Sequence, residues 1–260
     1  MSLPGLLLLH GVGDSGDCFG PFVARLREHG DGELAGLAVV TPSANCHGGQ
    51  RIRPTRTLAR ADQIAAATEH AVELVARTGR PIVLGGHSMG AAIALATAAG
   101  RPDLVAAVWL EDPPLMATMK ADDARTGMLV DISGFAEWIR PLQEMPLAHV
   151  VALVAGGHPQ WDVAEFEPWA RAKQTVDLAA FAEPVPFLDG WAADARRLEC
   201  PVVLAHGDPM RGSVVHPTAA AELAERSNWS VHALATGHDV RRDAPEDAVA
   251  LLGELIRSVV

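Results

Sequence analysis

Residues 81–100 read PIVLGGHSMGAAIALATAAG, in which an apolar run passes through a glycine-rich turn into a stretch of small residues. The segment Gly86-His87-Ser88-Met89-Gly90 fits the pattern Gly-x-Ser-x-Gly between a strand and a helix. The glycines let the two backbones approach each other and leave Ser88 at the tip of a tight turn, with its hydroxyl exposed. This motif is common by chance, but its place between a strand and a helix makes Ser88 a candidate nucleophile.

Short apolar runs that end in Gly, Asp or His alternate with helical stretches along the chain. This rhythm is typical of parallel strands that crossover helices bury on both faces. Six strands are predicted: 6–9, 37–40, 82–84, 105–110, 202–205 and 231–234. Between the second and third, residues 57–81 carry apolar side chains at helical spacing and end at Gly79 and Pro81, which predicts a helix.

Size and charge narrow the class of protein. The 260 residues are 49% hydrophobic, so one large core is expected. The net charge of −11 argues against nucleic acid or an anionic membrane as a partner, because both need a basic face, and it favours a small-molecule substrate. The sequence assigns no oligomeric state.

Neither a membrane segment nor a cofactor is expected. The apolar run at 6–9 is too short for a signal or a membrane span, and no window approaches about 20 apolar residues. Three cysteines match neither a disulfide framework nor a zinc site, and the histidines show no metal-ligand spacing. No nucleotide-binding glycine motif is present either. We therefore expect a cytoplasmic protein without metal or cofactor.

Residues 113–199 interrupt the alternation of strands and helices. They are rich in Pro, Trp, Met and Phe, which suits an irregular, largely helical insertion over a pocket. Such a cap excludes water and strengthens the electrostatics beneath it, although a second layer of ordinary core residues is the alternative. We expect a core of 1–112 and 200–260 with a cap of 113–199. The candidate substrate contacts in the cap are Met116, Trp138, Trp161, Trp169 and Phe187.

Three motifs together, HGVGDSG at 10–16, GHSMG at 86–90 and GHDV at 237–240, resemble those of the α/β-hydrolase superfamily. The resemblance extends along essentially the whole chain and implies the α/β-hydrolase fold. Relatives carry a further strand pair before the first motif, whereas here Leu6 begins the first strand. We therefore expect a mostly parallel sheet of about six strands, with helices on both faces and a helical cap insertion.

A serine hydroxyl is a weak nucleophile and needs a base, best supplied by an imidazole with a pKa near the working pH. His238 follows the last predicted strand, where the resemblance places the catalytic base. The same resemblance implies that the backbone N–H groups of Val12 and Met89 form the oxyanion hole. Two such preorganised donors stabilise the charge that develops on a carbonyl oxygen during acyl transfer.

An acid must also hold the tautomer of the imidazole, and two positions are open for it. Most relatives place it after the penultimate strand, where Asp208 is the only acid in 202–217. Some relatives place it at the end of the strand that follows the serine, which is Asp112 here. We prefer Asp112 and keep Asp208 as the alternative.

The sequence thus favours a serine hydrolase that cleaves an ester or lactone of a small apolar substrate through an acyl-enzyme on Ser88. Ser88 argues against epoxide hydrolase and haloalkane dehalogenase chemistry, since those relatives use Asp as nucleophile. A carbon–carbon bond hydrolase and a cofactor-free haloperoxidase remain alternatives on the same three residues. A ligand receptor without turnover is an alternative of another class, because the fold alone does not choose a function.

Overall fold

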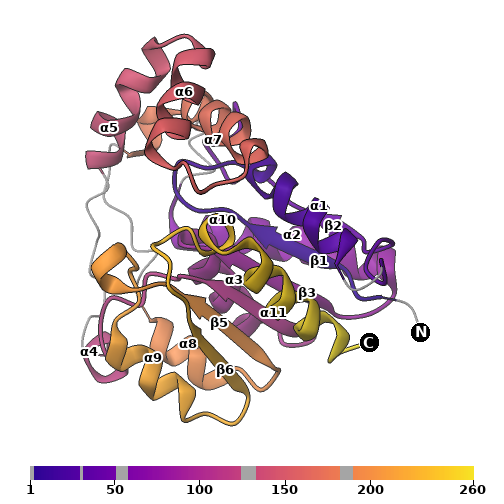
Figure 1. Cartoon of the computed structure of the whole chain (residues 1–260). Coiled ribbons are helices and arrows are strands. Elements are labelled where there is room, and N and C mark those ends of the chain that lie inside the picture. Colours follow the sequence, from indigo (N-terminus) through magenta and orange to yellow (C-terminus); the bar gives the residue numbers. More distant parts are fainter. Residues whose placement is uncertain (1–2, 30–31, 51–57, 124–132, 182–189) are drawn as a thin grey trace.

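A computed structural model of the chain describes residues 3–29, 32–50, 58–123, 133–181 and 190–260. A six-stranded sheet forms its centre, in the order β2-β1-β3-β4-β5-β6, with every neighbouring pair parallel (Figure 1). The strands are β1 Leu6–Leu9, β2 Val39–Val40, β3 Ile82–His87, β4 Val105–Glu111, β5 Val202–His206 and β6 Trp229–Ala233. The predicted parallel sheet of six strands is confirmed, with β2 shorter than expected.

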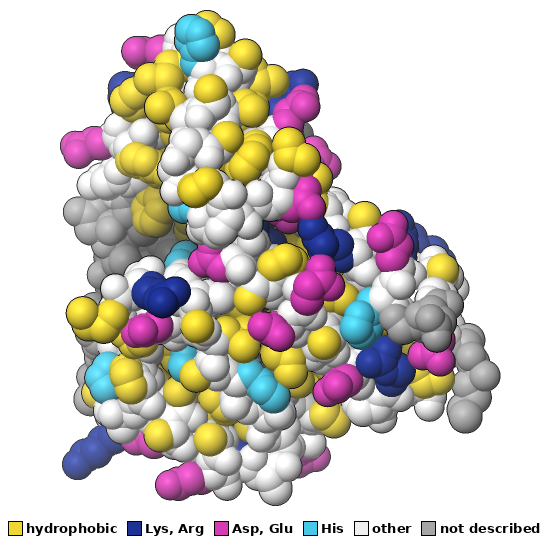
Figure 2. All heavy atoms as spheres, in the orientation of Figure 1, with side chains coloured by type: hydrophobic (Ala, Val, Ile, Leu, Met, Phe, Trp, Pro, Cys, Tyr) yellow, Lys and Arg dark blue, Asp and Glu magenta, His cyan; other side chains and the backbone are white. Residues whose placement is uncertain are grey.

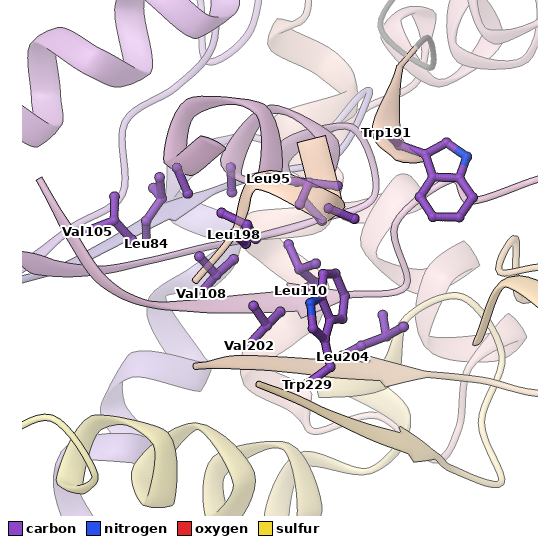
Figure 3. Packing of buried hydrophobic residues seen from close by; sticks show 14 of the residues in the cluster. Leu84, Leu95, Val105, Val108, Leu110, Trp191, Leu198, Val202, Leu204 and Trp229 are labelled. Carbon is purple, nitrogen blue, oxygen red and sulfur yellow. The ribbon is translucent and has the colours of Figure 1, made fainter. Parts of the chain in front are cut away.

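Strand side chains alternate between two apolar layers, because successive residues of a strand point to opposite faces. Leu7, Leu84 and Val108 belong to one buried cluster, whereas Leu8 and Trp109 belong to the other. Figure 3 shows part of the first cluster, to which the strand residues belong together with Leu95, Trp191 and Leu198. Both faces of the sheet are therefore buried, as the continuous apolar runs predicted.

Helices cover the two faces in separate sets. The first cluster packs under α2 Arg60–Thr78, α3 Met89–Gly100, α8 Trp191–Arg197 and α9 Pro217–Ala224. The second packs under η1 Gly16–Phe19, α1 Gly20–Glu28, α10 Val240–Asp243 and α11 Pro245–Arg257. The predicted helix at 57–81 is α2, and it stops at Gly79, whose φ of 74° suits glycine.

A further group of helices stands apart from these two layers in Figure 1. It consists of α5 Ser133–Glu144, α6 Leu147–Gly157 and α7 Val163–Thr175, followed by η2 Leu178–Phe181, and we call it the α5–α7 layer. Figure 2 shows hydrophobic side chains gathered on its outer surface. The remaining helices of 113–199 lie elsewhere: α4 Met119–Asp123 contacts α8, and α8 packs against α3 in the core.

In a parallel sheet the carboxyl ends of all strands lie at one edge, where ligands of such folds bind. The loops after β1, β3, β4 and β6 therefore bring Gly11, Ser88, Asp112 and His238 to the same edge. The helices of the described ranges include none that is long and apolar enough to span a bilayer.

Candidate active site

Ser88 occupies a sharp turn between β3 and α3. Its φ of 52° and ψ of −119° are strained for a residue with a side chain, and its N–H donates to the Glu111 carbonyl at 3.0 Å. The turn is possible because its neighbours lack side chains: a Cβ on Gly90 would lie 2.0 Å from the Leu9 carbonyl oxygen, and one on Gly86 2.5 Å from the Gly90 carbonyl carbon. The turn leaves Ser88 partly exposed.

Asp112 and His238 form a direct pair. His238 Nδ1 lies 2.5 Å from Asp112 Oδ2, so the ring donates a short hydrogen bond to the carboxylate. Asp112 is fully buried and also accepts hydrogen bonds from the Gly207 N–H, the Ser213 hydroxyl and the Val214 N–H. This carboxylate is therefore fixed in one orientation, and it fixes the tautomer of His238 with Nε2 free to act as a base.

The surroundings of His238 favour its protonated form. Burial lowers its pKa, but the hydrogen bond and the negative charge of Asp112 raise it more, so that the pKa lies above its ordinary value. About a third of the His238 side chain is exposed. The imidazolium that forms when His238 takes a proton is thus stabilised by Asp112.

Asp208, the alternative acid, has a different environment. It is exposed, and its Oδ1 accepts a hydrogen bond from the Met210 N–H at 2.8 Å. This contact caps the short helix η3 Pro209–Arg211. The geometry therefore favours Asp112 over Asp208 as the partner of His238.

His87 links the serine turn to the loop of His238. Its Nε2 donates to the His238 carbonyl at 3.0 Å, and the two rings lie 4.6 Å apart between centroids. Burial and the charge of His238 hold the pKa of His87 well below its usual range. His87 is therefore a neutral donor that keeps the His238 loop beside Ser88.

Among the described residues, the Ser88 hydroxyl has no hydrogen-bond partner. In many enzymes the hydrogen bond between the nucleophile and its base tightens only when substrate is bound.

The two predicted oxyanion donors come from the serine turn itself and from the loop after β1. A Cβ on Gly11 would lie 3.1 Å from Ser88 Cβ, so the loop after β1 passes directly against the serine. We call this loop, residues 10–14, the oxyanion loop. The Gly11 carbonyl accepts from His10 Nδ1 at 2.8 Å and from the Asp14 N–H at 3.2 Å. The Gly11 carbonyl and the Val12 N–H belong to one planar trans peptide and point in opposite directions. The hydrogen bonds to the carbonyl therefore also fix the direction of the Val12 N–H. Met89 contributes the first N–H of α3, at the positive end of the helix dipole.

Two buried histidines hold this loop. His47 Nε2 accepts from the Gly13 N–H at 3.0 Å, and His10 Nε2 accepts from the Ala44 N–H at 2.8 Å. Burial and the charge of neighbouring His10 lower the pKa of His47 to about 3, and burial also lowers the pKa of His10. Both rings are therefore neutral, with both nitrogens of each engaged. No local sequence pattern indicated this role for His47.

A buried ionic cluster joins the α5–α7 layer to the oxyanion loop. Lys173 of α7 donates to the Gly13 carbonyl at 2.9 Å and to Asp14 Oδ1 at 2.7 Å. Asp14 Oδ2 accepts from Arg241 at 3.2 Å and from Arg242 at 3.0 Å. Although burial alone would raise the pKa of Asp14, the three cations hold it well below its usual range. Asp14 is therefore a buried anion that ties three segments together.

The two arginines extend this cluster in two directions. Arg241 contacts both oxygens of the fully buried Glu111 at 3.1 and 3.2 Å, at the end of β4. Arg242 reaches Glu165 of α7 at 3.2 Å and Asp239 at 2.5 Å. The sequence carries a signal for this cluster: Arg241 and Arg242 follow the GHDV motif directly, and Lys173 is one of only two lysines in the chain.

The candidate cap contacts occupy different environments. Trp138 and Trp169 meet edge to face at 6.0 Å, and the Lys173 ammonium lies 4.6 Å from the Trp169 ring, so this pair sits next to the oxyanion loop. Trp161 is 5% exposed and donates to Asp243, so it packs at the junction of the α5–α7 layer with α10. Met116 is 56% exposed. Phe187 lies outside the described residues.

An apolar cluster that the sequence analysis did not propose lies over the oxyanion residues. Met89 is buried together with Ile139 of α5 and Phe181 of η2, and Val12 packs against them. A Cβ on Gly13 would lie 3.3 Å from Ile139 Cδ1, which shows how closely α5 approaches this loop. Within the described ranges, no group of three His, Cys, Asp or Glu side chains is arranged to hold a metal ion.

A parallel sheet with a serine on the turn between β3 and α3 is the arrangement of the α/β-hydrolase fold. The sequence profile of the alpha/beta hydrolase family matches residues 6–251. The chain therefore belongs to this family and is a hydrolase. No curated protein matches it.

Several solved structures share the fold. An N-formylmaleamic acid deformylase from Pseudomonas putida S16 has a TM-score of 0.69 at 21% identity, covering 97% of this chain and 94% of its own. A thioesterase domain from the curacin biosynthetic pathway has a TM-score of 0.68 at 19% identity, covering 98% and 91%. An esterase from M. tuberculosis has a TM-score of 0.66 at 19% identity, covering 99% and 86%. At these identities the likeness shows a common fold and leaves the substrate open.

Proposed function

We propose that the protein is a serine hydrolase that cleaves a carboxylic ester or lactone of a small substrate through an acyl-enzyme on Ser88. The observation that carries the proposal is the 2.5 Å hydrogen bond between His238 and the buried Asp112, beside a serine on a strained turn. A base whose second nitrogen is held by a carboxylate is the arrangement that activates a serine hydroxyl.

In the proposed acylation, His238 Nε2 takes the hydroxyl proton while Ser88 Oγ bonds to the substrate carbonyl carbon. The π electron pair of the carbonyl moves to its oxygen, and the N–H groups of Val12 and Met89 hold that charge. The intermediate then collapses: the bond to the leaving alcohol breaks, and the alcohol takes its proton from His238. An acyl-enzyme and a free alcohol result, and in a lactone the two stay joined as one chain.

Deacylation repeats these steps with water as the nucleophile. His238 removes a proton from the water as its oxygen bonds to the acyl carbon, and the same two N–H groups hold the oxyanion. The bond to Ser88 Oγ breaks and the serine recovers its proton from His238. The carboxylic acid leaves. Asp112 stays ionised throughout and stabilises the imidazolium in both halves of the reaction.

Two features support a cap function for the α5–α7 layer and an apolar substrate. Ile139 and Phe181 pack over Met89, and the Trp138–Trp169 pair lies beside the oxyanion loop. Apolar walls bind a substrate through its buried surface and exclude water from the charge that develops beneath them.

Labelling and turnover test the proposal together. We expect a fluorophosphonate probe to label the wild-type protein and p-nitrophenyl esters to be hydrolysed, whereas Ser88→Ala abolishes both. Ser230→Ala, an exposed serine on β6, is the matched control and is expected to keep both. Turnover by Ser88→Ala above background would refute a nucleophilic Ser88. Ligand binding without any labelling or turnover in the wild-type protein would favour a receptor instead.

A further inference from the structure

A cavity of about 190 Å³ lies between the carboxyl end of β1, helix α2 and the first turn of α3. Met89 and Gly90 form part of its wall, so it adjoins the N–H group that is proposed to hold the oxyanion. One water needs roughly 10–15 Å³ of such space, so the cavity has room for a substituent of several heavy atoms.

Gln63 of α2 lines this cavity and is 5% exposed. Its Nε2 is buried, and among the described residues it has no hydrogen-bond partner. A buried amide without a partner costs stability, so such groups in folded proteins call for an explanation. Two other polar side chains of the lining are engaged: Gln50 Nε2 donates to the Ser43 carbonyl at 3.2 Å, and both ring nitrogens of His10 are used within the loops.

The chemistry of the wall selects an uncharged ligand group. Of the described residues, those that line the cavity include no Asp, Glu, Lys or Arg, and burial lowers the pKa of His10 so that it is neutral. The other lining histidine, His70, is partly exposed, and its Nδ1 lies 4.0 Å from the Glu73 carboxylate. A carboxylate or an ammonium beside Gln63 would therefore meet no fixed opposite charge among the described lining residues, which is costly away from water. An amide or a hydroxyl, in contrast, can pair with Gln63, because rotation of the glutamine amide presents either its oxygen or its nitrogen.

We propose that this cavity is a subsite for a neutral amide or hydroxyl group on the acyl part of the substrate, and that Gln63 selects that group. The inference rests on the proposed function, because the cavity wall includes Met89, whose N–H is proposed to hold the oxyanion. The proposal depends on the unpaired Gln63 amide, because the substrate group would supply the hydrogen-bond partner that the protein does not supply.

Two esters with the same number of heavy atoms test the selectivity. p-Nitrophenyl 5-amino-5-oxopentanoate ends in an amide, and p-nitrophenyl 5-methylhexanoate ends in an isopropyl group of similar size. We expect Gln63→Met to lower the ratio of kcat/KM for the amide ester to that for the alkyl ester at least about 10-fold, the loss of one well-placed hydrogen bond. Glu69→Met, on the exposed side of the same helix, is the matched control and is expected to keep the ratio.

Thermal unfolding separates selection from a structural role. Because methionine removes an unpaired buried amide, Gln63→Met is expected to keep or raise the melting temperature. A ratio that changes less than 2-fold would mean that only water fills the cavity. A lower melting temperature with equal losses for both esters would mean that Gln63 only stabilises the fold. Either result overturns the proposal.

Binding of pentanediamide, a neutral diamide, gives a readout that does not need turnover. We expect it to raise the melting temperature of the wild-type protein and of Ser88→Ala, but not of Gln63→Met. If the proposed function fails, the wild-type protein shows no labelling and no turnover while the diamide still binds. If the subsite fails, turnover persists, and the diamide stabilises the wild-type protein and Gln63→Met equally or not at all.

Discussion

Replacing Asp112 with asparagine removes the charge of a carboxylate that accepts four hydrogen bonds. Oδ1 accepts from the Gly207 N–H and the Ser213 hydroxyl, and Oδ2 accepts from the Val214 N–H and His238. Asparagine has one oxygen and one NH₂ group, so it can accept at only one of these two positions. The substitution keeps the shape of the side chain and forces a choice between the two pairs.

Either orientation leaves one backbone N–H facing an NH₂ group. This N–H belongs to Gly207 in one orientation and to Val214 in the other, and an unpaired buried donor costs about 1–3 kcal/mol of unfolding free energy. If the NH₂ group faces His238, the ring must accept at Nδ1 and carry its proton on Nε2, which removes the base. Such a tautomer change lowers kcat by about 10⁴-fold. If the oxygen faces His238, the tautomer survives, but the charge that stabilises imidazolium is gone, and kcat falls by at least about 10²-fold.

Asp208→Asn is the matched control, because this exposed carboxylate accepts only from the Met210 N–H and asparagine caps a helix equally well. We expect it to change kcat less than about 2-fold. Single-turnover hydrolysis of a p-nitrophenyl ester and urea unfolding measure the two effects on both variants. Equal and mild losses of kcat in both would show that neither carboxylate acts on His238, and a larger loss in Asp208→Asn would reverse the assignment.

Two further predictions concern the base and the ionic cluster. Ester hydrolysis needs neutral His238, and the pKa of His238 is raised. We therefore expect kcat/KM to increase with pH and to reach half its maximum above pH 6.5, the ordinary pKa of histidine. A midpoint below pH 6 would contradict the pairing of His238 with Asp112. Lys173→Met removes a buried ammonium from Asp14 and from the oxyanion loop. We expect it to lower the unfolding free energy by about 2–4 kcal/mol, and urea unfolding that shows less than 1 kcal/mol would refute a stabilising role for Lys173.

The sequence contained most of the fold, because local patterns determine it. Apolar runs of strand length and a helix that ends at Gly79 correspond to elements of the structure, and the predicted parallel sheet is present. The serine turn could be located in the sequence because only glycine fits at positions 86 and 90. The turn therefore leaves the pattern Gly-x-Ser-x-Gly within five consecutive residues.

The contacts between distant segments could not be predicted in the same way. The choice between Asp112 and Asp208 depends on where His238 lies relative to the ends of β4 and β5, which no local pattern encodes. Lys173 and Asp14 are 159 residues apart, and charged side chains are usually exposed, so their burial was not expected. The lack of a partner for the Gln63 amide likewise depends on packing, because in the sequence Gln63 looks like any other helix residue that faces the core.

The ionic cluster also limits how substrate can enter. If α7 swung outward as a hinged lid, Asp14 would lose Lys173 and Arg242 would lose Glu165, and breaking these two buried ion pairs costs several kcal/mol. A difference of about 5.5 kcal/mol corresponds to roughly one molecule in 10⁴ in the swung-out state. Access to Ser88 is therefore expected to depend on shifts smaller than an outward swing of α7.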